Sequence, residues 1–375
     1  MKNDKNTNRP EPIFSRLGLP EQPVFLAPLA GVSDHPFRRV CQKLGADLTF
    51  VEMLSAVAIL QRSRRTLEML QRHPDEPILG VQLTGRNADE VARAVDWLNR
   101  YPFEVVDINM GCPVRKVVSG GSGSAILKDP ERVYQTVLKA TQSTDRPVTA
   151  KIRLGWDHKS INAVEVGLAA QEGGAAWLTV HGRTRADDYS VPVNLEKIAE
   201  VKAQLHIPVI GNGNIFSRQD MEYMTDKTGV DGVMVSRGAL GNPWIFREIK
   251  GDSRPVTLQE WLQVVTDHLR WQQEAYGNRG IGAICMRKHL LWYTKGWPGS
   301  KHLREKINVA DDLQEAIRLI ENFATELEKR GVQQRLPVHD SGFHTRFVWD
   351  PKYDMDRQLD RGVGDDGLAE VACSA

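Results

Sequence analysis

The sequence has little cysteine and no long apolar run, and both absences restrict what the chain can be. Its four cysteines, Cys41, Cys112, Cys285 and Cys373, are far apart, so they predict neither a disulfide framework nor a metal-ligand cluster. No apolar run approaches the roughly 18 residues that a membrane helix needs. The polar segment 1–11 lacks the apolar core of a signal peptide. We therefore expect a reduced, cytoplasmic protein with no structural metal and no membrane segment.

The overall charge is close to zero, with 49 basic and 48 acidic residues, but it is unevenly distributed. Segment 277–306 holds seven basic residues against the single acid Glu305, and Trp292, Tyr293 and Trp297 lie among them. Basic side chains beside aromatic rings are typical of surfaces that bind phosphates and bases. The same pattern also fits a solvated helical face with aromatic residues in its core, so both interpretations stay open.

Eight short apolar runs recur along the first two thirds of the chain, separated by stretches long enough for one helix each. Continuous hydrophobicity is typical of strands that are buried on both faces, as in a parallel sheet wrapped by helices. The pattern predicts an α/β fold, a (β/α)8 TIM barrel, with a doubly wound open sheet as the alternative. The runs are 24–27, 48–51, 78–83, 105–108, 148–152, 177–180, 208–211 and 231–235.

A chain of 375 residues exceeds the usual size of a single core, so a second unit after the barrel is expected. Helical periodicity over 261–276, 282–292 and 313–329 predicts a small all-α helical bundle. We expect an N-terminal extension (1–20), a barrel (21–250), a helical domain (255–335) and a polar, loosely ordered tail (336–375).

Cys112 is the first candidate for chemistry, since Gly111-Cys112-Pro113 follows the apolar run 105–108. A loop that leaves the carboxyl end of a barrel strand is where such enzymes place their reactive groups. A thiol there is a candidate proton donor or nucleophile. The alternative is a small buried hydrophobic residue, because free cysteine is often fully buried.

Two glycine-containing loops follow the last two apolar runs, Asn212-Gly213-Asn214 and 236–242. In barrels this pair of loops often holds a phosphate through backbone N–H groups, and Arg237 could add charge-assisted bonds. The alternative is a pair of tight turns. Together with Gln82, Lys151 and His181 at other strand ends, the loops favour a flat, hydrogen-bonding cofactor such as flavin mononucleotide (FMN).

In this order and at this spacing, the motifs resemble those of the tRNA-dihydrouridine synthases, in particular the branch with an Asn-Met-Gly-Cys-Pro motif. The resemblance covers residues 24–330. The matching segments are Ala27-Pro28-Leu29-Ala30-Gly31-Val32-Ser33-Asp34, Val81-Gln82, Asn109-Met110-Gly111-Cys112-Pro113, Lys151-Ile152-Arg153, Val180-His181-Gly182-Arg183-Thr184, Asn212-Gly213-Asn214 and Arg287-Lys288-His289.

The resemblance implies an FMN site with three parts. The isoalloxazine would be lined by the backbone of Pro28, Leu29 and Ala30, bonded at its edge by Gln82 and Lys151, and flanked by His181. The phosphate would be held by Asn212, Gly213, Asn214, Ser236 and Arg237. The family commonly has aspartate at the position of Asn214 and glycine at that of Ser236, and serine tolerates a positive φ less well than glycine.

The resemblance also implies a reaction, the reduction of the C5–C6 double bond of D-loop uridines in tRNA by FMN and NADPH. Cys112 would be the general acid, which suits a thiol that is protonated at neutral pH. Asn109 and Arg153 would face the uracil, swung out of the folded tRNA. Arg287, Lys288 and Lys295 would contact tRNA, and we expect a monomer.

Two other functions remain open. An FMN-dependent barrel dehydrogenase of a free, pyrimidine-like small molecule would share the cofactor loops but has no need for the basic segment 277–306. An RNA-binding protein without catalytic activity has no need for Cys112, Lys151 and His181 at strand ends.

Overall fold

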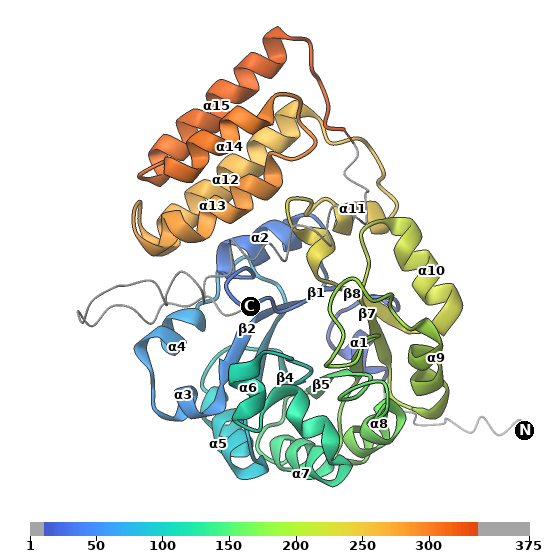
Figure 1. The fold of residues 1–375 in the computed structure, drawn as a ribbon. Coiled ribbons are helices and arrows are strands. Elements are labelled where there is room, and N and C mark those ends of the chain that lie inside the picture. The colour runs from blue at the N-terminus through green and yellow to red at the C-terminus, as the bar shows by residue number, and fades with distance from the viewer. Residues whose placement is uncertain (1–10, 337–375) are drawn as a thin grey trace, which may run out of the picture.

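A computed structural model of the chain describes residues 11–336, so the first half of the predicted N-terminal extension and all but the first residue of the predicted tail lie outside the described residues. Its eight parallel strands form one sheet in the order β1-β8-β7-β6-β5-β4-β3-β2 (Figure 1). Backbone bonds from Leu26 N to Leu48 O (2.9 Å) and from Asp47 N to Val24 O (2.9 Å) close the sheet between its first two strands. The strands are β1 (Val24–Leu26), β2 (Thr49–Ser55), β3 (Leu79–Thr84), β4 (Val105–Met110), β5 (Val148–Arg153), β6 (Leu178–His181), β7 (Val209–Asn212) and β8 (Gly232–Val235).

The predicted (β/α)8 barrel is confirmed, and the open doubly wound sheet is wrong because the strands close into a ring. Every strand starts within one residue of a predicted apolar run. The helices between the strands are α2 (His35–Lys43), α3 (Ala56–Leu60), α4 (Arg64–Met69), α5 (Ala88–Leu98), α6 (Arg115–Ser119), α7 (Pro130–Thr141), α8 (Ala163–Glu172), α9 (Leu195–Gln204), α10 (Arg218–Thr228) and α11 (Ile245–Ile249), with 3₁₀ turns η1 (Gly123–Lys128) and η2 (Arg237–Ala239).

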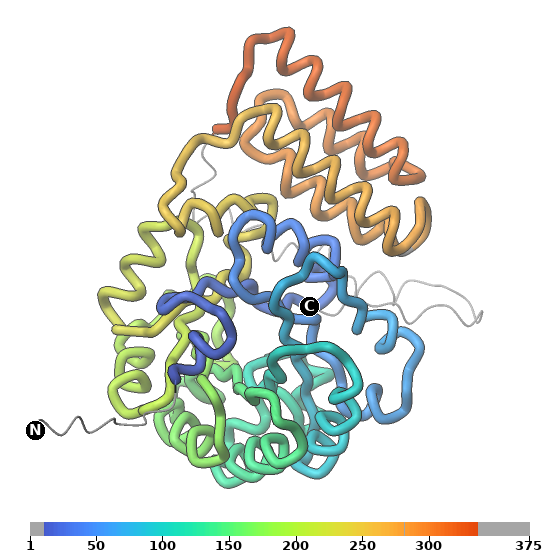
Figure 2. The backbone as a smooth tube through the Cα atoms, turned by 180° about the vertical axis from the view of Figure 1, so that it is seen from behind, coloured from blue at the N-terminus to red at the C-terminus, as the bar shows by residue number. Residues whose placement is uncertain are grey.

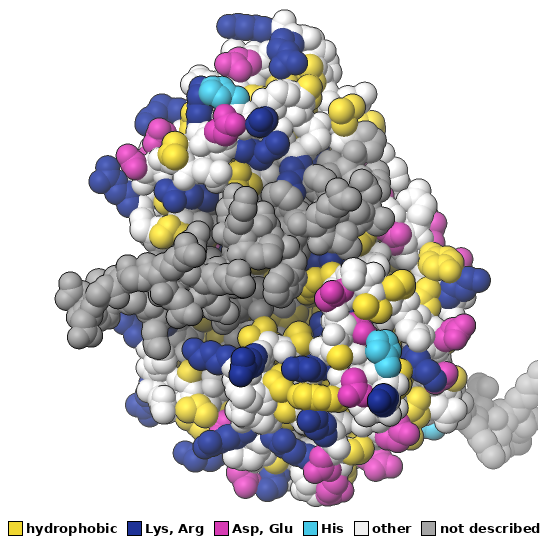
Figure 3. All heavy atoms as spheres, in the orientation of Figure 1, with side chains coloured by type: hydrophobic (Ala, Val, Ile, Leu, Met, Phe, Trp, Pro, Cys, Tyr) yellow, Lys and Arg dark blue, Asp and Glu magenta, His cyan; other side chains and the backbone are white. Residues whose placement is uncertain are grey.

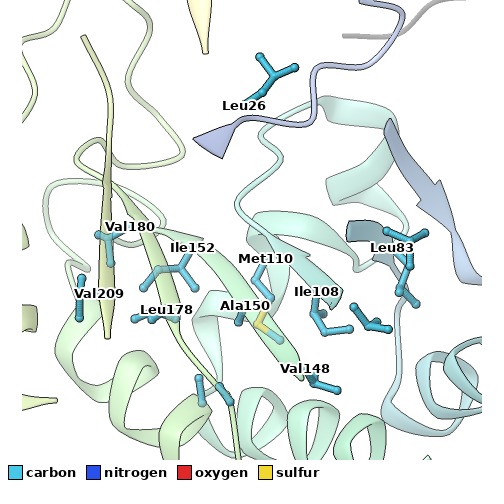
Figure 4. Packing of buried hydrophobic residues seen from close by; sticks show 14 of the residues in the cluster. Leu26, Leu83, Ile108, Met110, Val148, Ala150, Ile152, Leu178, Val180 and Val209 are labelled. Atoms are coloured by element: carbon cyan, nitrogen blue, oxygen red, sulfur yellow. The ribbon is translucent and has the colours of Figure 1, made fainter. Parts of the chain in front are cut away.

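Successive residues of each strand face opposite sides of the barrel wall, as the pleat requires. Along β1, Leu26 belongs to the apolar layer between strands and helices, whereas Phe25 belongs to a separate cluster with Trp177 and Ile210 inside the barrel. Figure 4 shows side chains of the outer layer packed between the strands and the surrounding helices. The same alternation decides which polar residues can reach the barrel interior.

A short helix that we did not predict, α1 (Ile13–Arg16), packs on the amino-terminal end of the strands. The ring of Phe14 lies 5.7 Å from Trp177 and 6.3 Å from Phe25 between centroids. Burying such a ring contributes about 1.5–3 kcal/mol. This contact covers one end of the barrel interior and leaves the carboxyl ends of the strands for the site.

The helical part consists of α12 (Leu258–Tyr276), α13 (Ile281–Tyr293), α14 (Ser300–Val309) and α15 (Leu313–Lys329), and lies on one side of the barrel beside α2 (Figures 1 and 2). It has its own apolar core, in which Trp261 donates from Nε1 to the carbonyl of Tyr293 (2.9 Å). Tyr293 and Trp297 are core residues. The helical bundle is confirmed, whereas the exact domain boundaries stay a prediction. No helix within residues 11–336 is both long and apolar enough to cross a membrane.

Candidate active site

The predicted site residues on the strands face the barrel interior because their neighbours face outward. Val81, Ile108 and Ile152 pack in the outer layer, so the residues that alternate with them point inward. Strand register places Asn109 opposite Lys151, Arg153 opposite His181, and His181 opposite Asn212. The structure therefore brings these predicted residues together at the carboxyl ends of β3 to β7: Gln82, Asn109, Lys151, Arg153, His181 and Asn212.

One hydrogen-bonded chain runs along the inner face of β3, β4 and β5. Gln82 donates from Nε2 to Asp107 Oδ2 (2.8 Å) and accepts at Oε1 from Asn109 Nδ2 (2.9 Å). Thr149 Oγ1 donates to Asp107 Oδ1 (2.6 Å), and burial raises the pKa of the Asp107 carboxyl. The sequence analysis missed Asp107 and Thr149. Asp107 could have been found, since it lies two residues before Asn109 and so shares its face.

Cys112 lies on a loop that Asn109 holds in place. Asn109 Oδ1 accepts from the backbone N–H groups of Gly111 (3.1 Å) and Cys112 (2.9 Å), and the Cys112 carbonyl accepts from Ser124 N (3.0 Å). The thiol is half-buried, and burial raises its pKa above the ordinary value for cysteine. Cys112 is therefore a protonated thiol at neutral pH, as a general acid must be.

A second chain of hydrogen bonds joins β5, β7 and β8. Lys151 Nζ donates to Asn212 Oδ1 (2.9 Å), while Asn212 Nδ2 donates to Met234 O (2.8 Å) and Ser236 Oγ (3.0 Å). Burial, followed by the charge of Arg153, lowers the pKa of Lys151 to about 8, so its ammonium form still dominates at pH 7. Ser236 has φ −114°. The backbone at this position therefore does not need the positive φ that serine would tolerate less well than glycine.

The loops after β6, β7 and β8 form a cationic corner in which two buried arginines meet at the exposed Asn214. Asn214 has φ +53°, and its Oδ1 accepts from Nη2 of both Arg183 (3.1 Å) and Arg237 (3.1 Å). Nη1 of Arg237 is buried without a hydrogen-bond partner. Gly213 has φ +122°, and a Cβ there would lie 3.0 Å from Cδ2 of His181. The corner thus has an unused buried donor and a backbone approach that a side chain would block.

His181 lies at the centre of this charge and is only 8% exposed. Burial is the first cause that lowers its pKa, well below the ordinary value, and the surrounding cations are the next. The imidazole is therefore neutral at pH 7 and can contact a ring or donate one hydrogen bond without adding charge. The cations that act on it are Arg153, Lys151, Arg183 and Arg237.

Two residues of the corner were not among the predicted site residues. Arg183, only 1% exposed, lies in the quoted His181-Gly182-Arg183 motif, and its length could have pointed to this role. Tyr189 places its ring 3.8 Å from the guanidinium carbon of Arg237. Nothing in the sequence around Tyr189 indicates that contact, because it depends on how the loop after β6 lies against the turn after β8.

The loop after β1, predicted to line a cofactor through Pro28, Leu29 and Ala30, is half-buried at the same end of the barrel. It is held from two sides at its next residue, Gly31. The Gly31 N–H donates to the Glu52 carboxylate, and the Gly31 carbonyl accepts from the ammonium of Lys288 on α13. The helical domain thus fixes a loop of the predicted site.

All three predicted tRNA contacts are at least partly buried. Arg287 donates to the carbonyl of Ala310 (2.7 Å), Lys288 bonds Gly31, and Lys295 is only 6% exposed, with its pKa lowered to about 6 chiefly by burial. Their phosphate contacts stay a prediction. Figure 3 shows other basic side chains on the surface of the helical part. The exposed ones there include Arg279, Lys301 and Lys306.

A closed parallel barrel with a thiol, a buried lysine and a cationic corner at the carboxyl ends of its strands defines a barrel enzyme. Residues 25–329 match the model of the family described as "Dihydrouridine synthase (Dus)". The chain belongs to the dihydrouridine synthase family and is an oxidoreductase.

Curated relatives agree with this assignment along nearly their whole length. The chain is 39% identical over 306 residues to tRNA-dihydrouridine synthase B of Pasteurella multocida, covering 80% of this chain and 92% of the relative. It is 37% identical over 310 residues to the protein of that name in Pseudomonas putida, covering 81% and 91%. It is also 39% identical over 306 residues to probable tRNA-dihydrouridine synthase 1 of Synechocystis, covering 80% and 85%.

Proposed function

We propose that this chain is a tRNA-dihydrouridine synthase that reduces D-loop uridines of tRNA to 5,6-dihydrouridine, with FMN in the barrel and NADPH as the electron donor. The observation that carries this proposal is the pairing, at one end of the barrel, of the protonated Cys112 thiol with the cationic corner around Asn214. The family assignment supports the same reaction.

The residues of the corner fit the phosphate of FMN. The unpartnered Nη1 of Arg237 is a buried donor that needs an acceptor, and a phosphate oxygen would satisfy it. Without a Cβ, Gly213 lets its backbone approach the ligand closely. Asn212 and Ser236 already bond each other beside it. Asn214, held by two guanidinium groups, completes the proposed phosphate site.

The ring of the flavin would lie over the carboxyl ends of β3, β5 and β6. Gln82 and Lys151 would bond its polar edge, and neutral His181 would lie beside it. The backbone of Pro28, Leu29 and Ala30 would cover the opposite part of the site. When bound and reduced by NADPH, FMN supplies the hydride that is added to C6 of the uracil.

The chain's own residues then supply the proton that is added to C5 of the uracil. Cys112 holds a proton on Sγ and delivers it to C5, which forms the C–H bond there, breaks the S–H bond and leaves a thiolate that solvent reprotonates. Asn109 fixes the Cys112 loop through two backbone bonds. Arg153, held by the carbonyl of Thr184 (2.6 Å), would face the uracil carbonyls. Hydride and proton together account for the two hydrogens of the product.

The helical domain supplies the proposed grip on tRNA. Extracting a base from folded RNA costs a few kilocalories per mole, which contacts to the backbone and stacking must offset. We place these contacts on α13, α14 and the loop between them. Arg287, Lys288 and Lys295 are the predicted set, and the exposed basic side chains nearby are further candidates.

The experiment is reconstitution with defined components. Purified protein is expected to be yellow, to release about one FMN per chain on denaturation, and to convert unmodified transcript tRNA to dihydrouridine when NADPH is added. Free uridine at the same concentration is the control substrate. Reduction of free uridine in preference to tRNA would support the small-molecule dehydrogenase instead, and a colourless protein that takes up no flavin would contradict both.

A further inference from the structure

A cluster of three ligand-type side chains lies at the junction of the barrel and the helical domain, away from Cys112. Asp34 caps the start of α2, His268 lies in α12 and His289 lies in α13. One ligand atom from each residue lies within 4.8 Å of the other two. His268 is 0% exposed and His289 is 1% exposed. The two imidazole centroids are 4.8 Å apart at an interplanar angle of 66°.

Each imidazole is held at one nitrogen and has no partner at the other. Nδ1 of His268 lies 3.0 Å from the Tyr293 hydroxyl, and His289 forms a hydrogen bond with the backbone of Val32. Nε2 of His268 and Nδ1 of His289 are buried without a hydrogen-bond partner. Asp34 uses Oδ1 to accept from Phe37 N (3.2 Å), which leaves its other oxygen for the cluster. Two unpartnered imidazole nitrogens and a partly buried carboxylate therefore lie close together.

We propose that Asp34, His268 and His289 bind a zinc ion that fastens the helical domain to the barrel. Two imidazole nitrogens and a carboxylate oxygen are a common zinc ligand set, with a fourth position left for another ligand or water. Histidine ligands typically carry a hydrogen bond on the other ring nitrogen, as both rings do here. Gln272 on α12 lies close enough to Asp34 to lower its pKa, and both amide atoms of Gln272 are buried without a hydrogen-bond partner.

Burial disfavours the charged form of all three groups, since it lowers the pKa values of His268 and His289 and raises that of Asp34. Burial lowers the pKa of His268 to about 3, so its ring is neutral at pH 7 and offers a lone pair. Asp34 forms no hydrogen bond with either imidazole, so the three groups are not held together by a shared proton. A cation bound between them would draw the ligand atoms together from their present spacing to about 2.0–2.2 Å from the metal.

Two cations, Arg38 and Lys288, lower the pKa of Asp34, and both also form bonds outside the cluster. Arg38 forms a buried ion pair with Glu76 (2.8 Å), and Lys288 bonds the carbonyl of Gly31. The zinc ion would tie Asp34 of the barrel to two helices of the other domain. Because Asp34 follows the loop of Pro28, Leu29 and Ala30, the bound ion would also stabilise that loop.

The test begins with the full-length protein, purified without chelator and without a metal-binding tag. Elemental analysis is expected to give about one zinc per chain. After the zinc is removed by a chelator, one equivalent of Co²⁺ should produce the intense visible bands of tetrahedral coordination, and Zn²⁺ should abolish them. Zn²⁺ is expected to raise the melting temperature of the metal-free protein by several degrees. Absence of bound zinc together with absence of these bands would overturn the proposal.

Variants locate the ion. His268→Gln and His289→Gln each remove one ligand and are expected to lose the cobalt bands, whereas His302→Gln, on the exposed face of α14, should keep them. Tyr293→Phe keeps both ligands and removes only the hydroxyl beside His268. It should weaken zinc binding by about 10- to 100-fold. Unchanged cobalt binding in both ligand variants would place the metal elsewhere and overturn the proposal, whatever the outcome for tRNA.

Discussion

Lys151 on β5 donates a 2.9 Å hydrogen bond to the side-chain oxygen of Asn212 on β7, although 61 residues separate them. The bond crosses the inner face of β6, where His181 lies between the two strands. It ties the part of the site predicted to bind the flavin ring to the part predicted to bind the phosphate. The charge on Lys151 therefore affects both parts.

This relationship predicts a pH dependence of flavin binding. Because the pKa of Lys151 is about 8, its ammonium form dominates at pH 7 and is lost as the pH rises through 8. FMN affinity is expected to fall between pH 7 and 9, as measured by flavin fluorescence titration. Lys151→Met should bind FMN weakly at both pH values, whereas Lys159→Met, on an exposed loop, should behave like the wild type. An equally steep pH dependence in Lys151→Met would rule out Lys151 as its source.

Cys112→Ala separates the two halves of the reaction. The variant should keep its FMN and its reduction by NADPH, because neither needs the thiol proton. Dihydrouridine formation on tRNA should fall by about 10²- to 10⁴-fold, the usual effect of losing a general acid. Single-turnover assays of both steps make the comparison, with Cys285→Ala in the helical domain as the matched control. Full activity of Cys112→Ala would return this cysteine to a packing role.

Arg237→Ala tests the proposed phosphate site. A hydrogen bond to a charged group contributes about 1.5–3 kcal/mol, so the FMN dissociation constant should rise by about 10- to 150-fold. Riboflavin, which lacks the phosphate, should bind wild type and variant almost equally. Arg64→Ala, with a side chain that is 94% exposed on α4, is the charge-matched control. If riboflavin binding falls as much as FMN binding, Arg237 does not contact the phosphate.

The surface of the helical domain gives a prediction about salt. Replacing the exposed Arg279, Lys301 and Lys306 with alanine should weaken tRNA binding and leave flavin content intact. Each lost phosphate contact lowers the slope of log affinity against log salt by about 0.7–0.9, so three contacts give about 2 to 3. The control variant replaces three exposed basic residues of the barrel helices and loops with alanine, namely Arg93, Arg100 and Lys227. Equal slopes in both triple variants would mean that α14 and the loop before α13 do not face tRNA.

The same measurement tests the set predicted from sequence, Arg287, Lys288 and Lys295. If these residues contact phosphates, their alanine variants should lower the slope by the same amount per residue. If the slope stays unchanged while stability or flavin content falls, they act inside the protein. The bond from Lys288 to the carbonyl of Gly31 would explain a loss of stability or flavin content in the Lys288 variant.

The strands could be predicted from sequence because each is buried on both faces and so reads as a continuous apolar run. Helix α14 could not be predicted, because only two of its apolar residues, Leu303 and Ile307, are buried, while Val309 is exposed and the other residues are polar. The inward direction of Gln82 and Lys151 follows from alternation along a strand once the outer residues are known.

Contacts between segments that are far apart in the chain could not be predicted from the sequence. Arg183 and Arg237 meet at Asn214 from loops that follow different strands, and no local pattern specifies that meeting point. Lys288 and Gly31 are 257 residues apart. The first contact depends on how three barrel loops pack together, and the second on how the helical domain docks on the barrel. Periodicity and motif spacing encode neither.

The most direct test of the proposed function is position-resolved mass spectrometry of dihydrouridine in tRNA from cells with and without the gene for this chain. Loss of the gene should abolish dihydrouridine at one or more D-loop positions and leave the other modifications unchanged. A copy of the gene should restore it, whereas the Cys112→Ala gene should not. Unchanged dihydrouridine at every position in cells that lack both the gene and any second enzyme of this family would contradict the account.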